Sequence, residues 1–170
     1  MALPNRMSNR LPCYDYSTSG AYFITICTQN RKQILSKLVG TGVLDCPQVQ
    51  LSKYGKVAER YILQLNNFYD HISVDKYVIM PNHIHILLSV QGQSGTPVPT
   101  DDCEIDNKNS TVAKFVSTFK RFCNKEYGEN IWQNRYYDHV IRNQQDYNDI
   151  WEYIEFNPTQ WKKDSLYQEP

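Results

Sequence analysis

The sequence has no excess charge, because its 170 residues include 18 basic and 18 acidic side chains. Proteins that bind duplex DNA indiscriminately rely on many contacts from lysine and arginine to phosphates, so zero net charge argues against that class. It leaves room for a local basic surface, since the charges are unevenly placed. Acidic residues gather at 101–106 and basic residues at 114–125.

Paired cysteines and long apolar runs are also missing. The five cysteines form no Cys-x-x-Cys pair, which argues against a zinc ribbon and against a disulfide framework. No apolar run approaches the roughly 20 residues that span a bilayer, and the N-terminus lacks the apolar core of a secretory signal. We therefore expect a soluble, cytoplasmic protein with reduced thiols and no membrane partner.

What the chain does have is enough length for one domain and an unusual share of aromatic residues. We expect a single domain over 21–160, between an N-terminal tail (1–20) and a C-terminal tail (161–170). Residues 91–109 combine Gly, Pro, Ser and acid without a period, which predicts a flexible loop. The 13 Tyr and 3 Trp suit core packing as well as stacking on nucleobases.

Hydrophobic patterns predict the element order β-α-β-β-α-β-α. The strands are expected at 21–28, 72–80, 83–90 and 136–141. The helices are expected from Ser52 to 68, from Ser110 to Gly128 and over 144–156, whereas residues 33–50 read as irregular. The first six elements match an α+β, ferredoxin-like (RRM-like) antiparallel sheet with helices on one face, to which a C-terminal helix is added.

His83 and His85 lie one strand step apart. Because side chains of a strand alternate between its faces, both imidazoles point one way while Ile84 and Ile86 point into the core. Two imidazoles so placed can share a divalent ion. The spacing alone fits an ordinary pair of half-exposed polar residues equally well, and tight binding would need further ligands.

On the last predicted helix, Tyr153 and Asn157 are four residues apart and therefore share a face. A phenol and an amide oxygen facing a metal held by two histidines would serve as nucleophile and third ligand. The spacing also fits a plain mixture of core and surface positions. With 13 tyrosines in the chain, it does not single out Tyr153.

The chain resembles a known family along nearly its whole length. The matching blocks, which occur in order, are residues 10–16, 20–31, 77–88 (with the run Met-Pro-Asn-His-Ile-His), 116–120, 131–143 and 153–158. Together they resemble the single-tyrosine transposases that carry a His-hydrophobe-His motif, in particular the REP-associated tyrosine transposases of bacteria. That family has the ferredoxin-like fold expected above.

The resemblance implies a metal-dependent endonuclease and strand transferase that acts in transposition and DNA recombination, on single-stranded DNA at hairpin-forming palindromic repeats. It makes Tyr153 the nucleophile of a covalent 5′-phosphotyrosine intermediate, with Tyr136 and Tyr137 as rivals. It makes His83 and His85 metal ligands and Asn157 a third ligand. The ion is expected to be Mg²⁺ or Mn²⁺, with no organic cofactor, and both a monomer and a homodimer remain open.

Candidate DNA contacts gather in two groups, although each is equally compatible with a solvated surface charge. The phosphate contacts are Lys114, Lys120, Arg121 and Lys125, together with Arg6 and Arg10 of the tail. Arg135 and Arg142 flank Tyr136 and Tyr137, an arrangement that suits clamping and stacking of a displaced base. His139 is expected to have a structural or supporting role.

Two other functions remain open. A catalytically inactive or domesticated protein would use the same sheet to bind DNA hairpins without cutting them. A metal hydrolase for small phosphate esters would need a carboxylate beside the histidine pair, and the sequence reveals none, with Asp138 undecided.

Overall fold

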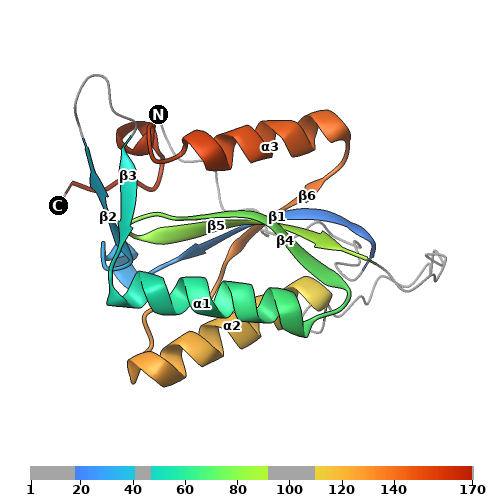
Figure 1. The fold of residues 1–170 in the computed structure, drawn as a ribbon, viewed down its shortest axis with the longest axis horizontal. Coiled ribbons are helices and arrows are strands. Elements are labelled where there is room, and N and C mark those ends of the chain that lie inside the picture. Colours follow the sequence, from blue (N-terminus) through green and yellow to red (C-terminus); the bar gives the residue numbers. More distant parts are fainter. Residues whose placement is uncertain (1–17, 41–46, 92–109, 170) are drawn as a thin grey trace.

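The computed structural model describes residues 18–40, 47–91 and 110–169. Its centre is a four-stranded antiparallel sheet in the order β4-β5-β1-β6 (Figure 1). The strands are β1 (Gly20–Cys27), β4 (Ile72–Ile79), β5 (His83–Val90) and β6 (Tyr137–Ile141). The predicted loop at 91–109 lies outside the described residues except for its first position, and so do Arg6 and Arg10.

Helices α1 (Lys53–Phe68) and α2 (Thr111–Tyr127) cover one face of this sheet (Figure 1). As the sequence predicted, Ser52 and Ser110 cap them, and their side chains accept hydrogen bonds from the first free backbone N–H groups. Alternate residues of the two central strands meet the helices in the main apolar core. They include Tyr22, Ile24, Ile26, Ile84, Ile86 and Leu88.

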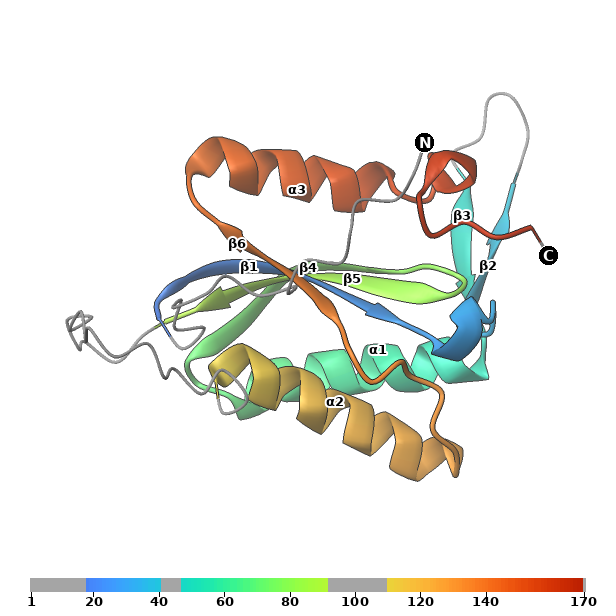
Figure 2. The ribbon, with the colours of Figure 1, turned by 180° about the vertical axis from the view of Figure 1, so that it is seen from behind.

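Helix α3 (Gln144–Phe156) lies across the opposite face of the sheet (Figures 1 and 2). Its buried Ile154 packs against Phe23 and Leu87 in a second, smaller apolar cluster. The α+β, ferredoxin-like class is confirmed, and the appended helix makes the central strands buried on both sides. The sheet is thus a middle layer, with α1 and α2 packed on one face and α3 packed on the other.

The prediction that residues 33–50 are irregular was wrong in part. Strands β2 (Ser36–Val39) and β3 (Gln48–Leu51) pair as an antiparallel ribbon separate from the main sheet. Each is four residues long and interrupted nearby by glycine or proline, so neither gives a clear pattern. The backbone just before the ribbon packs closely on the first turn of α1, because a β-carbon on Gly55 would collide with the backbone oxygen of Leu35.

The end of the chain is folded, although the sequence assigned 161–170 to a tail. A short helical turn, η3 (Trp161–Lys163), buries the indole of Trp161 against the imidazole of His83, with ring centres 5.7 Å apart. We call residues 161–169 the C-terminal segment. Among the residues that the structure describes, no helix is both long and apolar enough to cross a membrane.

Candidate active site beneath helix α3

The central strands direct a set of polar side chains toward α3. In the register of β1 and β5, Thr25 stands opposite His85 and Cys27 opposite His83. Since Phe23 and Leu87 on the same strands pack in the α3 cluster, strand alternation places both histidines on that face. The sequence prediction that His83 and His85 point away from the core isoleucines is therefore confirmed.

The two imidazoles face each other at hydrogen-bonding distance. Their Nε2 atoms lie 2.9 Å apart, and the side chains are buried, with 0% and 2% of the residue exposed. Burial lowers the pKa of His83 to about 4, although the Asp164 carboxylate opposes the shift. Burial, and to a smaller extent the neighbouring His83, lowers the pKa of His85 well below its usual range. At neutral pH both rings are uncharged and carry lone pairs, as metal ligands must.

The other nitrogen of each ring also has a partner. Nδ1 of His83 lies 2.8 Å from Oδ1 of Asn82, and Nδ1 of His85 lies 2.8 Å from the hydroxyl of Thr25. Such contacts fix ring orientation and leave the two Nε2 atoms directed into the site. No pattern in the sequence assigns Asn82 or Thr25 a role beside the histidines, because their contacts depend on strand register and on the turn between β4 and β5.

The structure adds a carboxylate that the sequence did not reveal. Potential ligand atoms of His83, His85 and Asp164 all lie within 4.8 Å of one another. The Asp164 carboxylate is held by the backbone N–H of Leu166 (2.6 Å) and by Nδ2 of Asn157 (2.9 Å). Asp138, left undecided from the sequence, aligns with Ile24 in the register and so shares the face of the α1–α2 core.

Asn157, the predicted third ligand, does lie beside the site. Its amide nitrogen donates to Asp164, while its Oδ1 is buried and has no hydrogen-bond partner among the described residues. An amide oxygen in this condition is costly unless something satisfies it. The structure therefore gives Asn157 a definite role in holding Asp164 and leaves its oxygen available to a cation.

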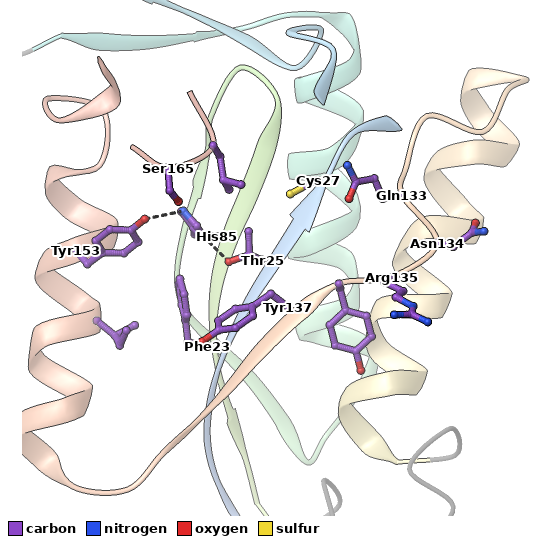
Figure 3. A pocket seen from close by; sticks show the side chains of 13 residues that line it. Phe23, Thr25, Cys27, His85, Gln133, Asn134, Arg135, Tyr137, Tyr153 and Ser165 are labelled. Atoms are coloured by element: carbon purple, nitrogen blue, oxygen red, sulfur yellow. Dashed lines mark hydrogen bonds between the residues drawn. The ribbon is translucent and has the colours of Figure 1, made fainter. Parts of the chain in front are cut away.

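Tyr153 projects from α3 toward His85 (Figure 3). Its hydroxyl lies 3.4 Å from Nε2 of His85 and 3.3 Å from Oδ2 of Asp164. Burial, reinforced by the charge of Asp164, raises the pKa of Tyr153 to about 12. Of the two rival nucleophiles, Tyr136 places its ring 5.7 Å from the Lys120 ammonium, and Tyr137 is half exposed at the start of β6.

Tyr153 separates two hollows. The larger, of about 820 Å³, runs from His85 and Thr25 to the segment before β6, and Arg135, Tyr136 and Tyr137 line it (Figure 3). The smaller, of about 440 Å³, is lined by the carboxylates of Asp149, Glu152 and Asp164 and by the basic Lys163. We call the larger hollow the aromatic pocket.

The predicted basic contacts divide between two places. Arg135 is exposed at the aromatic pocket, and Arg142 is exposed at the end of β6. The remaining candidates, Lys114, Lys120, Arg121 and Lys125, lie on α2, beyond the sheet from the histidines. Arg121 and Lys125 line a third hollow of about 760 Å³, the α2 pocket, which shares Gln133 and Asn134 with the aromatic pocket.

Lys120 differs from the expected phosphate contact. Its ammonium donates to the backbone oxygens of Gln133, Asn134 and Arg135, at 2.7, 3.4 and 3.3 Å. Burial lowers the pKa of Lys120 to about 8. The side chain thus holds the wall between the aromatic and α2 pockets. His139, as expected for a structural residue, pairs with Asp146 in the first turn of α3.

Comparisons with known proteins agree with this architecture. The chain is 32% identical to an uncharacterised protein of Haemophilus influenzae, over 96% of its own length and 93% of that protein. It is 27% identical to the REP-associated tyrosine transposase of Escherichia coli, covering 87% of this chain and 73% of the relative. No protein-family model matches.

The fold has also been seen before. A solved structure of a REP-associated tyrosine transposase bound to a REP hairpin superimposes with a TM-score of 0.58 and 20% identity, covering 95% of this chain and 74% of that one. At this identity the likeness concerns the fold. The chain is thus similar in sequence to a REP-associated tyrosine transposase and shares the fold of a solved member of that family.

Proposed function

We propose that this protein cuts and rejoins single-stranded DNA beside hairpin-forming repeats, using Tyr153 as the nucleophile and a divalent cation held by His83, His85 and Asp164. The observation that carries the proposal is the convergence of the Tyr153 hydroxyl, from α3, on the histidine pair, from β5. The hairpin substrate is suggested by the solved relative, which is bound to a REP hairpin.

The residues present fit a divalent ion. Two neutral imidazole nitrogens and one carboxylate converge within 4.8 Å, and the buried Oδ1 of Asn157 nearby has no donor among the described residues. A mixed set of nitrogen and oxygen ligands suits Mn²⁺, while Mg²⁺ is the more abundant alternative. In the proposed site Asp164 is the third ligand, and Asn157, the third ligand implied by the family resemblance, becomes a candidate for a fourth.

When bound by these residues, such an ion would supply positive charge that orients a phosphate group and favours ionisation of the neighbouring phenol. The chain's own groups explain why that charge matters. Tyr153 is more weakly acidic than an ordinary tyrosine, with a pKa of about 12, because it is partly buried and stands beside the Asp164 carboxylate. A site with these residues alone disfavours the tyrosinate that attack requires.

The proposed reaction is a transesterification in which bonds balance. As the Tyr153 oxygen bonds to phosphorus, its phenolic proton passes to water. The bond from phosphorus to the 3′ oxygen breaks, and a proton from water is taken up by that oxygen, which leaves as a 3′-OH, so no net proton is gained or lost. The 5′ end stays on Tyr153 as a phosphodiester, so a 3′-OH can later attack it and rejoin the strand.

The aromatic pocket is proposed to hold the unpaired strand next to the scissile phosphate. Tyr136 and Tyr137 line it, where bases could stack, and Arg135 lines it, where a phosphate could be contacted. Its volume of about 820 Å³ lies within the usual range for ligand pockets, roughly 300–1,000 Å³. The Lys120 ammonium, which ties down the 133–135 backbone, keeps this wall in shape.

The test is covalent capture. Full-length protein is incubated with Mn²⁺ and an oligonucleotide carrying a hairpin and single-stranded flanks, then separated on a denaturing gel. The native chain is expected to form an adduct whose mass places the 5′-phosphate on Tyr153, and Tyr153→Phe to form none while still binding the hairpin. Tyr147→Phe is the matched control on the same helix, because the Tyr147 hydroxyl bonds to Asp75 away from the site.

An adduct in Tyr153→Phe would overturn the nucleophile assignment and direct attention to Tyr136 and Tyr137. Hairpin binding without cleavage by the native chain, in both Mg²⁺ and Mn²⁺, would favour the inactive binder instead. Hydrolysis of a small phosphate ester without any adduct would favour the metal hydrolase, whose required carboxylate Asp164 supplies.

A further inference from the structure

Asn82 stands in the turn between β4 and β5 and is completely buried. Each hydrogen bond that the structure shows for Asn82 reaches a residue of the site or of a segment that supports the site. The backbone oxygen accepts from the N–H and the hydroxyl of Thr28, at 2.9 and 3.0 Å. The side-chain oxygen contacts His83, and the side-chain nitrogen donates to the backbone oxygen of Leu166 at 2.9 Å.

These contacts fix the proton on His83. The Asn82 amide has one orientation, because its nitrogen must face the Leu166 carbonyl, which only accepts hydrogen bonds. Its oxygen therefore faces Nδ1 of His83, 2.8 Å away, and a carbonyl oxygen cannot donate. His83 must then carry its proton on Nδ1, which leaves the Nε2 lone pair free to face the ion.

The same amide also positions the carboxylate. Leu166, whose oxygen accepts from Asn82, donates its backbone N–H to Oδ1 of Asp164 at 2.6 Å. The other oxygen of Asp164 lies 3.9 Å from Nε2 of His83. A chain of hydrogen bonds thus runs from His83 through Asn82 and Leu166 to Asp164, and joins strand β5 to the C-terminal segment.

We propose that Asn82 is the positioning residue of the metal site: it fixes His83 in the Nδ1–H tautomer and anchors the C-terminal segment that brings Asp164 to the histidines. The inference rests on the proposed function in that the site binds a metal. A buried amide with both groups engaged is expected to rigidify the ligands before the ion arrives. No other described contact of His83 Nδ1 or the Leu166 oxygen duplicates these two bonds.

The proposal predicts a definite pattern of imidazole protons in the metal-free protein. With the His83 proton on Nδ1, the 2.9 Å contact between the rings requires Nε2–H of His85 to donate to Nε2 of His83. Thr25 then donates its hydroxyl proton to Nδ1 of His85. The pair should show one Nδ1–H ring and one Nε2–H ring, and the chain has only four histidines to resolve.

The experiment measures side-chain ¹⁵N–¹H correlations of ¹⁵N-histidine-labelled full-length protein in the presence of a chelator, with the His83 signals assigned through His83→Gln. Asn82→Leu removes both bonds at similar volume and is expected to abolish the pure Nδ1–H pattern of His83. Asn82→Asp keeps an acceptor opposite Nδ1 and is expected to retain it. Asn66→Leu is the control, because Asn66 holds the backbone of Val74 away from the site.

Calorimetric titration with Mn²⁺ gives the second readout. Asn82→Leu is expected to weaken Mn²⁺ binding by about 10- to 100-fold, as loss of a group that orients a metal ligand does elsewhere, whereas Asn66→Leu leaves it unchanged. Unaltered tautomers together with unaltered Mn²⁺ affinity in a folded Asn82→Leu protein would overturn the proposal. If Asn82→Leu fails to fold, Asn82→Ser carries the same comparison, because its shorter hydroxyl cannot bridge both partners.

The outcomes separate this inference from the proposed function. Absence of Mn²⁺ binding by the native chain would remove the metal from the proposed function. The tautomer measurement, made without metal, would still support or overturn the role of Asn82 in holding His83.

Discussion

The two faces of the sheet are built by the same strands but differ in kind. Toward α1 and α2, β1 and β5 present large apolar side chains such as Ile24 and Ile86, which pack in one continuous core. Toward α3, the neighbouring positions present Thr25, His83 and His85, with only a small apolar cluster around Ile154. The face toward α1 and α2 contains most of the buried apolar side chains. The face toward α3 contains buried polar groups that need hydrogen-bond partners.

This difference shows how a small domain carries a polar site at its centre. Burying neutral imidazoles and a carboxylate is costly unless each is hydrogen-bonded. Here Thr25, Asn82 and Asn157 provide hydrogen bonds to these groups, while packing on the other face contributes most of the folding free energy. Substitutions on the two faces should therefore separate stability from activity.

The largest effect is expected on the apolar face. Ile86 is fully buried, and Ile86→Ala is expected to lower the free energy of unfolding by about 2–5 kcal/mol, because it removes buried methyl groups and leaves a cavity. Urea unfolding followed by circular dichroism measures it. The graded control Ile86→Val should cost about 0.5–1.5 kcal/mol. If Ile86→Ala lowered the free energy of unfolding by less than about 2 kcal/mol, the apolar face would not contribute most of the stability.

On the polar face, His85→Ala should do the reverse. Adduct formation with hairpin DNA is expected to fall at least about 100-fold, because a ligand of the proposed ion is lost. The free energy of unfolding should change less than in Ile86→Ala, by about 1 kcal/mol, as for an average substitution. Gel assays of the adduct and urea unfolding of the same preparation test both parts. A stability loss equal to that of Ile86→Ala would erase the distinction between the faces.

The sequence anticipated the secondary-structure elements and the facing of their residues better than the contacts that complete the polar site, for a physical reason. Strand and helix periods are local, so the bounds of α3, the caps Ser52 and Ser110, and the facing of His83 and His85 could all be read from short stretches. Strands β2 and β3 were missed because four residues are too few to show a period.

The polar site instead depends on residues far apart in the chain. Asp164 reaches the histidines only because Trp161 buries its ring beside His83 and anchors the C-terminal segment, a contact with no periodic signature. Lys120 looked like a free cation until the structure placed the 133–135 carbonyls around its ammonium. Family resemblance pointed to Tyr153, yet no spacing in the chain could.

The uncharged state of the histidines gives a smaller and graded test. The pKa of His83 is lowered to about 4 and that of His85 is also lowered, whereas unfolded histidines titrate near about 6.5. Between these values the unfolded state binds protons that the folded state does not. The contribution of these histidines to the free energy of unfolding is therefore complete above about pH 6.5. It should fall as pH drops toward 4, by about 1.4 kcal/mol per pH unit for each such histidine.

Urea unfolding in a chelator at pH 7, 6 and 5 measures this slope. Carboxylates add their own dependence, so the comparison is with His83→Gln, which keeps a polar side chain but cannot titrate. That variant should lose about one histidine's share of the slope between pH 6.5 and 5. Parallel curves for the two proteins would mean that His83 is protonated as readily when folded as when unfolded.

The smallest expected effect concerns whether DNA touches both faces. The aromatic pocket and the α2 pocket share Gln133 and Asn134, so a hairpin with its single strand beside Tyr153 can extend its duplex stem toward Arg121 and Lys125. Each of Arg121→Gln and Lys125→Gln is then expected to reduce the slope of log affinity against log salt by about 0.9, the value for a duplex phosphate. Arg135→Gln should reduce it by about 0.7, the value for a single strand.

Fluorescence anisotropy with a labelled hairpin across a salt series resolves these slopes, with Lys56→Gln on the exposed side of α1 as the control. Equal slopes for Arg121→Gln, Lys125→Gln and Lys56→Gln would confine the DNA to the α3 side, and α2 would then serve the core alone. Reduced slopes at Arg121 and Lys125 would instead make the edge at 133–134 the crossing point. In that case the Lys120 ammonium, bonded to that backbone, would be what links a helix of the apolar face to the strand held at the polar one.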